Sequence, residues 1–168
     1  VEVFYATDRA RSGDPTPSQF YGHGRGKLEL GLATVTIPDT HQPGILEAPS
    51  IWRLEFGPNA AKHVVLQSVE VLEGDTFFQL FNDRLDSAAA PDVFVFIHGY
   101  NVRFEQAAKR AAQMAYDLNF AGLPVLYSWP SRGSTMGYVP DTAVVQLSGR
   151  RLSHFLDDLI DRTGARKL

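Results

Sequence analysis

The sequence of 168 residues contains no cysteine, which excludes disulfide bonds, a thiol nucleophile and cysteine-ligated zinc. No apolar run approaches the ~20 residues of a membrane-spanning helix, and the first residues, VEVFYATDRA, lack the charged-then-apolar layout of a signal peptide. The formal net charge is only −3 at pH 7, so nothing electrostatic points to nucleic acid or an anionic membrane as a partner. A protein without disulfides is compatible with both the cytoplasm and the periplasm, so the sequence does not identify the compartment.

The length and composition are those of one soluble domain. Apolar residues make up 44% of the chain and charged residues 21%, which is ordinary for a globular protein. A chain of this length can bury a sizeable core but is not clearly long enough for two domains. We therefore expect one domain over residues 1–168, strand-rich in residues 1–73 and mixed in residues 74–168.

Short alternating runs predict the strands of the first region. VEVFYA (1–6) ends at the polar segment TDRARSGDPTPSQ (7–19), whose Asp, Ser, Gly and Pro residues indicate a loop. In KLELGLATVTIP the apolar positions change parity at Ala33, which predicts a bulge or two short strands. The links between the runs are short, so we expect antiparallel neighbours. The other predicted strands are IWRLEF (51–56) and HVVLQSVEVLE (63–73).

The second region changes to the helical period. A helix capped by Asp75 or Thr76 is expected to end near Ala88, and another follows the apolar stripe that begins at Phe104. Between them DVFVFI is continuously apolar, which predicts a strand buried on both faces. LPVLYSW predicts a second buried strand, PSRGSTMGYVPDT a loop, and the next stripe a helix ending near Gly164. This alternation indicates a parallel sheet between layers of helices, a three-layer α/β fold.

Two polar turns, HGYN (98–101) and SWPS (128–131), follow these apolar strands. Ligands of open parallel sheets bind at the carboxyl ends of strands, so both turns are candidate sites. Gly99 allows a sharp bend that aims an amide into a cavity, and an N–H aimed at a developing oxyanion contributes about 3 kcal/mol to acyl transfer. The alternative is an ordinary strand-to-helix turn, in which Asn101 caps the helix and His98 bonds nearby backbone.

The strings VFYATDRA, FIHGYNVRFEQAAKRAAQMAYDL and PVLYSWPSRG resemble a bacterial branch of uncharacterised, esterase/lipase-like α/β-hydrolases. The resemblance extends over nearly the whole chain. It implies the front half of the α/β-hydrolase sheet, with antiparallel strands leading into parallel strand-helix-strand-helix units. It also implies that the backbone N–H of Tyr100 is an oxyanion-hole donor and that His98 and Gly99 shape its turn. The expected substrate-binding residues are Asn101, Ser128, Trp129 and Ser131.

The resemblance departs at the nucleophile. The serine of this fold lies in Gly-x-Ser-x-Gly after the next strand, and the acid and the histidine base follow it. No such motif occurs here, and the closest string, WPSRG around Ser131, has Trp in place of the first Gly. We expect the missing serine a few residues after Leu168, with the acid and base later. Residues 1–168 would then be the incomplete, amino-terminal part of a serine hydrolase for an ester or related acyl substrate, inactive alone, in which His98 is not the base.

Two other functions compete with this hypothesis. The missing nucleophile equally fits a non-catalytic binding or assembly domain on a hydrolase scaffold. A nucleotide-binding domain is disfavoured because the glycine-rich segment YGHGRGK precedes a strand pattern instead of a helix, so Arg25 and Lys27 are expected in a solvated turn. The histidines lack metal-binding spacing, so neither a metal nor another cofactor is expected.

The final residues ARKL stand where the next strand should begin, beside the strand DVFVFI. An uncovered apolar strand edge pairs or aggregates. We therefore expect that the 168-residue piece either self-associates through this edge or is covered there by further chain.

Overall fold

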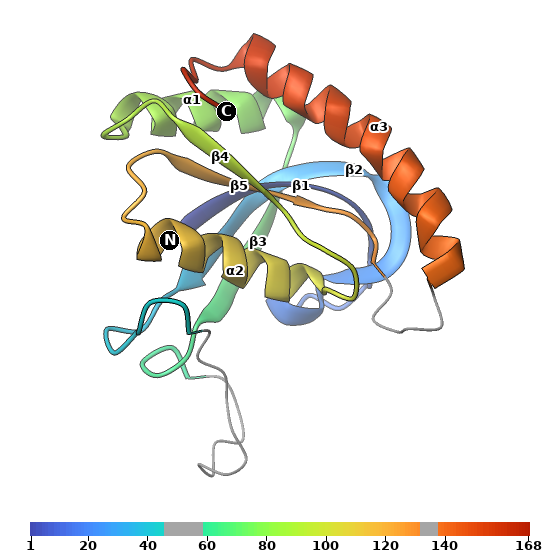
Figure 1. Ribbon diagram of the computed structural model, residues 1–168, viewed down its shortest axis with the longest axis horizontal. Helices are drawn as coiled ribbons and strands as arrows, with labels where there is room; N and C mark the ends of the chain where they lie inside the picture. Colours follow the sequence, from blue (N-terminus) through green and yellow to red (C-terminus); the bar gives the residue numbers. More distant parts are fainter. Residues whose placement is uncertain (46–58, 132–137) are drawn as a thin grey trace.

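The computed structural model describes residues 1–45, 59–131 and 138–168 (Figure 1). A five-stranded sheet in the order β3-β2-β1-β5-β4 forms its centre. β1, β2 and β3 pair antiparallel, whereas β5 pairs parallel with both β1 and β4. The strands are β1 (Glu2–Arg11), β2 (Tyr21–Thr36), β3 (Val65–Leu72), β4 (Val93–Ile97) and β5 (Leu123–Ser128).

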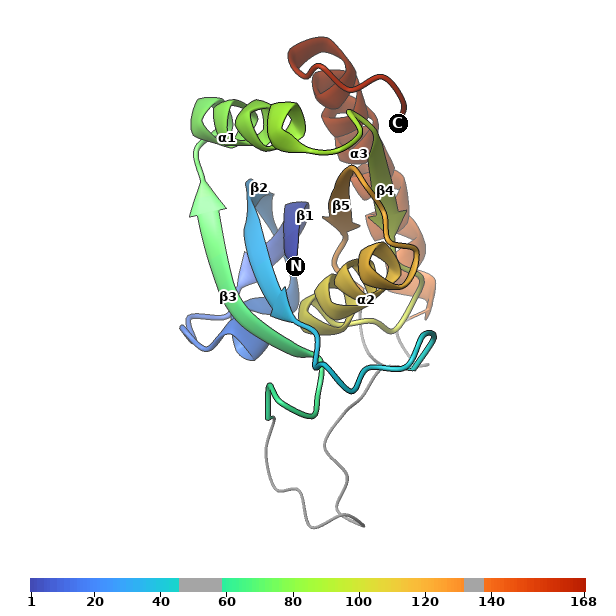
Figure 2. The same cartoon turned by 90° about the vertical axis from the view of Figure 1, so that its left-hand side faces the viewer.

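Helices cover both faces of this sheet, which confirms the expected three-layer α/β fold. α2 (Phe104–Asp117) packs on one face, while α1 (Gly74–Ser87) and α3 (Tyr138–Arg162) pack on the other (Figure 2). A short 3-10 helix, Pro17–Gln19, joins β1 to β2. No helix in the described ranges is long and apolar enough to cross a membrane.

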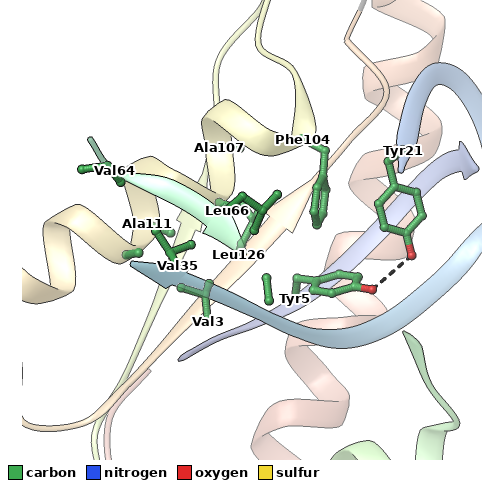
Figure 3. Close-up of a cluster of buried hydrophobic side chains, with 13 residues drawn as sticks. Val3, Tyr5, Tyr21, Val35, Val64, Leu66, Phe104, Ala107, Ala111 and Leu126 are labelled. Carbon is green, nitrogen blue, oxygen red and sulfur yellow. Dashed lines mark hydrogen bonds between the residues drawn. The ribbon is translucent and has the colours of Figure 1, made fainter. Parts of the chain in front are cut away.

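The core on the α2 face explains why this helix has an alanine stripe. Ala107 and Ala111 are fully buried against Val3, Val35 and neighbouring side chains of the sheet (Figure 3). Small side chains let the helix approach the strands closely, and dense packing of this kind is what protein interiors require.

Aromatic rings dominate the core on the opposite face. Phe4 of β1 meets Phe77 and Phe81 of α1 edge-on, with ring centroids 5.5 and 4.8 Å apart. Phe155 and Leu159 bring α3 onto the same cluster. Burial of rings this large supplies much of the free energy that holds helices on a sheet.

Several expected element boundaries were wrong. Contacts with residues distant in sequence help to decide where an element begins and ends, and a local sequence pattern does not contain them. β1 continues through Arg11, so the first residues of the predicted loop are strand. The segment YGHGRGK belongs to β2, although Arg25 and Lys27 are exposed as expected. α1 begins at Gly74 without a side-chain cap from Asp75 or Thr76, and α3 begins at Tyr138, inside the predicted loop.

Of the expectations about the strands, the bulge was confirmed and the burial of β4 was wrong. The predicted bulge is confirmed, because the β2–β3 register shifts between Thr34 and Val35. β4 is not buried on both faces: it lies at the sheet edge, and Ile97 is 46% exposed. Lys167 forms a parallel bridge to Asp92 beside β4, where the sequence predicts the next strand to begin. The predicted strand over residues 51–56 lies outside the described residues.

Candidate functional site

The two predicted turns meet at the carboxyl edge of β4 and β5. The Asn101 backbone N–H donates a 2.6 Å hydrogen bond to Ser131 Oγ, and the Trp129 indole N–H donates a 2.8 Å bond to the His98 carbonyl oxygen. His23 Nδ1 of β2 lies 3.0 Å from the Ser131 carbonyl oxygen and ties a third strand to the same point. The structure thus joins residues 98–101 and 128–131 into one unit.

Aromatic rings stack across this unit. The rings of His98 and Trp129 are nearly parallel, with centroids 5.3 Å apart and planes at 13°. The Tyr100 ring meets Trp129 edge-on at 5.2 Å. His98 and Trp129 are buried, whereas Tyr100 is about half exposed. The indole therefore supports both the histidine and the exposed end of the turn.

His98 is held as a neutral imidazole. Its Nδ1 lies 2.7 Å from the carbonyl oxygen of Gly99, which can only accept, so Nδ1 carries the proton. Burial lowers the pKa of His98 to about 4, so the ring is neutral at physiological pH and Nε2 is an acceptor. The Ser128 hydroxyl, 3.1 Å away, can donate to Nε2. Both ring nitrogens of His98 are therefore engaged inside the protein, Nδ1 by the turn and Nε2 by Ser128.

The histidine bond fixes the direction of the next amide. The Gly99 carbonyl oxygen and the Tyr100 N–H belong to one peptide unit, and in a planar trans peptide they point in opposite directions. The structure contains no cis peptide bond in its described residues. Because the Gly99 oxygen points at the His98 ring, the Tyr100 N–H points away from it. His98 therefore orients the amide that the sequence predicts as a donor.

A mainly apolar cavity of about 250 Å³ opens beside this peptide. Four predicted site residues, His98, Gly99, Tyr100 and Trp129, line it. Its other lining residues are Ile97, Tyr127, Ser148, Gly149 and Leu152.

The remaining predicted site residues lie elsewhere. Ser128 and Ser131 are fully buried, and their hydroxyls bond within the protein. Asn101 lines a separate cavity of about 300 Å³ on the α2 side of β4. Within the described residues, no group of three or more histidine, aspartate and glutamate side chains is placed to hold a metal ion.

The sharp bend of the turn is at Asn101, not at Gly99. Asn101 has φ = 60°, in the left-handed region, and Gly99 is not among the positive-φ glycines of the described residues. A Cβ added at Gly99 would meet nothing within 4 Å. Glycine at this position therefore keeps space open beside the cavity instead of permitting a special backbone angle.

This placement predicts that Gly99→Ala leaves the free energy of unfolding unchanged or raises it by about 0.4–1 kcal/mol, because alanine loses less backbone entropy on folding. Gly31→Ala is the matched control, since a Cβ at Gly31 would collide with the Glu70 carbonyl oxygen and the Tyr5 ring. Urea unfolding of both variants measures the difference. A Gly99 variant as unstable as the Gly31 variant would show that residue 99 is constrained.

The residues that sequence reasoning missed are Thr7, Asp8 and Arg9, all buried at the carboxyl end of β1. Thr7 Oγ1 donates a 2.6 Å bond to the Ser128 carbonyl oxygen. Arg9 Nε donates a 2.9 Å bond to Ser128 Oγ. One sequence signal could have placed these polar residues in a strand: no glycine or proline occurs before Gly13, so nothing in the sequence ends the strand there.

Asp8 faces the opposite side of the sheet and secures α3. Its Oδ2 accepts a 2.7 Å hydrogen bond from Ser148 Oγ and lies 3.5 Å from the Arg151 guanidinium. Oδ1 is buried without a hydrogen-bond partner. Ser148 also lines the apolar cavity, so this anchor places the helix that forms one wall of the site.

Comparison with known proteins adds one match. Residues 74–168, more than half of the chain, match a family model described as an alpha/beta hydrolase of unknown function (DUF900). The matched region includes both turns and α1, α2 and α3. No curated protein and no solved structure matches the chain.

Proposed function

The chain belongs to this α/β-hydrolase family of unknown function, and from that premise we propose that it contributes the oxyanion-hole turn of a serine hydrolase acting on an ester or related acyl substrate. The backbone N–H of Tyr100 is one oxyanion donor. The observation that carries the proposal is the Gly99–Tyr100 peptide, whose carbonyl is held by His98 at the edge of the apolar cavity. The acyl group occupies that cavity.

Fixed orientation is what gives such a donor its catalytic value. An amide already aimed at the position of the developing negative charge needs no reorganisation during the reaction, and a site that excludes water strengthens it. The Tyr100 amide is fixed on one side by the histidine and on the other by the bond from Asn101 N–H to Ser131. Preorganisation of this kind contributes about 2.7–4 kcal/mol per donor.

The proposal places the nucleophile, the acid and the base outside residues 1–168. No Gly-x-Ser-x-Gly motif occurs in the sequence. Ser131, in the closest string, is fully buried and accepts a bond from Asn101. His98 is a poor base, because its pKa is about 4 and its Nε2 is occupied within the protein.

The experiment is covalent labelling of the full gene product that carries residues 1–168 with a fluorophosphonate probe, followed by mass spectrometry of the labelled peptide. We expect one labelled serine outside residues 1–168, in a Gly-x-Ser-x-Gly context. Ser131→Ala tests whether Ser131 is itself the nucleophile: the label should stay on the same serine outside residues 1–168, at a lower rate because the bond from Asn101 N–H is lost. Absence of any labelled serine would overturn the proposal, and ligand retention in the cavity without turnover would favour a binding domain instead.

A further inference from the structure

Arg9 is a buried arginine whose hydrogen-bond partners, among the residues that the structure describes, are all uncharged. It is 1% exposed. Its Nε donates to Ser128 Oγ at 2.9 Å, one terminal nitrogen to the Gly22 carbonyl oxygen at 3.2 Å, and the other to the Val102 carbonyl oxygen at 2.6 Å. That last nitrogen also lies 3.3 Å from His98 Nε2. One guanidinium thus joins β1, β2, β5 and both ends of the candidate turn.

In the described part of the chain, no carboxylate pairs with Arg9 on its own face of the sheet. The adjacent carboxylate, Asp8, points to the α3 face and bonds to Ser148. Burial lowers the pKa of Arg9 to about 10, and Asp8 opposes this shift only in part. The guanidinium therefore stays protonated at neutral pH, and the cost of burying a cation without a close counterion is offset here by its hydrogen bonds to Ser128, Gly22 and Val102.

Arg9 enforces, from the other side of the ring, the same proton position on His98 that the Gly99 carbonyl oxygen requires. A guanidinium has donors and no acceptor, so the ring nitrogen that faces it must accept. Nε2 faces Arg9, which leaves the proton of the neutral ring on Nδ1. Nδ1 then donates to the Gly99 carbonyl oxygen and sets the direction of the Tyr100 N–H. Ser128 alone would not impose this state, since a hydroxyl can donate or accept.

We propose that Arg9 is a positioning residue: it locks His98 in its Nδ1–H form, holds the Val102 end of the turn, and keeps a positive charge behind the peptide that binds the oxyanion. The last part rests on the proposed function, because only acyl transfer creates that anion. The first two parts concern the turn itself and hold whatever ligand the cavity takes.

The first test is NMR of the full gene product labelled with ¹⁵N-histidine. Among the described residues that contact His98, Arg9 of β1 carries a charge, while Ser128 of β5, Trp129 directly after it and Gly99 of the turn are neutral. In the wild type we expect one neutral tautomer with Nδ1 protonated. Arg9→Met should give a mixture of tautomers, raise the His98 pKa while burial keeps it below the ordinary value, and speed hydrogen exchange of the Tyr100 amide at least tenfold. Arg25→Met, at the cross-strand neighbour of Arg9, is the matched exposed control and should change none of these.

Two further variants keep the test decisive if Arg9→Met does not fold. Arg9→Lys retains the charge but not the forked geometry, so we expect faster exchange at Tyr100 with little change in the His98 pKa. Ser128→Ala removes the hydroxyl beside Nε2 and should leave the Nδ1–H tautomer in place. An unchanged Tyr100 exchange rate in Arg9→Lys, or loss of the tautomer in Ser128→Ala, would overturn the proposal.

The second test is hydrolysis of an activated acyl ester, p-nitrophenyl acetate, by the same proteins. Arg9→Met and Arg9→Lys should lower kcat, with a small change in KM, because misplacement by about 1 Å costs up to about 100-fold. If the wild type hydrolyses the ester and both variants match it, Arg9 has no positioning role although the proposed function stands. If the wild type is inactive and labels no serine while the NMR changes occur, the proposed function falls and the control of the turn by Arg9 stands.

Discussion

Replacement of Tyr100 by proline is expected to lower the kcat of the full gene product by about 10²–10³-fold, with little change in KM. Proline lacks a backbone N–H, so the substitution removes the proposed oxyanion donor itself. Loss of one such donor costs about 2.7–4 kcal/mol of transition-state stabilisation. Because the donor acts on charge that appears only in the transition state, the loss falls on kcat. Steady-state hydrolysis of p-nitrophenyl acetate measures it.

Tyr100→Ala separates the amide from the ring. Alanine keeps the N–H but removes the ring that meets Trp129 edge-on at the cavity, so KM should rise while kcat falls far less than in the proline variant. Thermal unfolding of both variants checks that the turn still folds. Equal losses of kcat in the two variants would assign the effect to the side chain and contradict the role of the Tyr100 amide.

The layers of the fold could be predicted from sequence because their signals are local. Period-two runs located β2 and β3, and the parity change at Ala33 predicted the bulge that lies between Thr34 and Val35. Apolar stripes likewise located the three α-helices of the described residues, since each buries one face whatever it packs against. The helix starts were less predictable, because α1 begins without a side-chain cap at all.

The support of the candidate site could not be predicted, because its contacts are remote in sequence. Arg9 meets His98 and Ser128, which lie 89 and 119 positions further along the chain. The local pattern of TDRAR is polar and predicts a loop, whereas the folded sheet supplies hydrogen-bond partners for Thr7 and Arg9 and for one of the two carboxylate oxygens of Asp8. Turn composition, by contrast, did locate His98, Gly99, Tyr100 and Trp129 at one cavity.

Because His98 is buried, we expect a second large effect: the free energy of unfolding depends on pH. In the unfolded chain a histidine titrates near 6.5, whereas in the folded protein the pKa of His98 is lowered to about 4, chiefly by burial and also by the charge of Arg9. Between these two values the unfolded state binds more protons than the folded state. The free energy of unfolding must therefore fall as the pH falls.

The pH range over which stability is lost, and the size of that loss, follow from the two pKa values. The stabilisation is complete above about pH 6.5, decreases by about 1.4 kcal/mol for each pH unit below it, and reaches a loss of about 3 kcal/mol near pH 4. Below pH 4 the ring is protonated in both states, and His98 adds no further loss. A loss of this size is a large fraction of the 5–15 kcal/mol that stabilises a typical protein.

Urea unfolding at pH 7, 6, 5 and 4.5 measures this dependence in the wild type, in His98→Gln and in the control His154→Gln. His154 is exposed, so its removal should leave the pH dependence intact, whereas His98→Gln should flatten it between pH 6.5 and 4.5. Glu2 and Asp117, whose pKa values are lowered by hydrogen bonds to Arg84 and to the Gly44 N–H respectively, lose their charge only in more acidic solution. They therefore contribute equally to all three proteins, and the difference between the histidine variants isolates His98. If the wild type and His98→Gln lose stability in parallel across this range, then His98 is not held neutral and the fixed Gly99–Tyr100 peptide loses its physical cause.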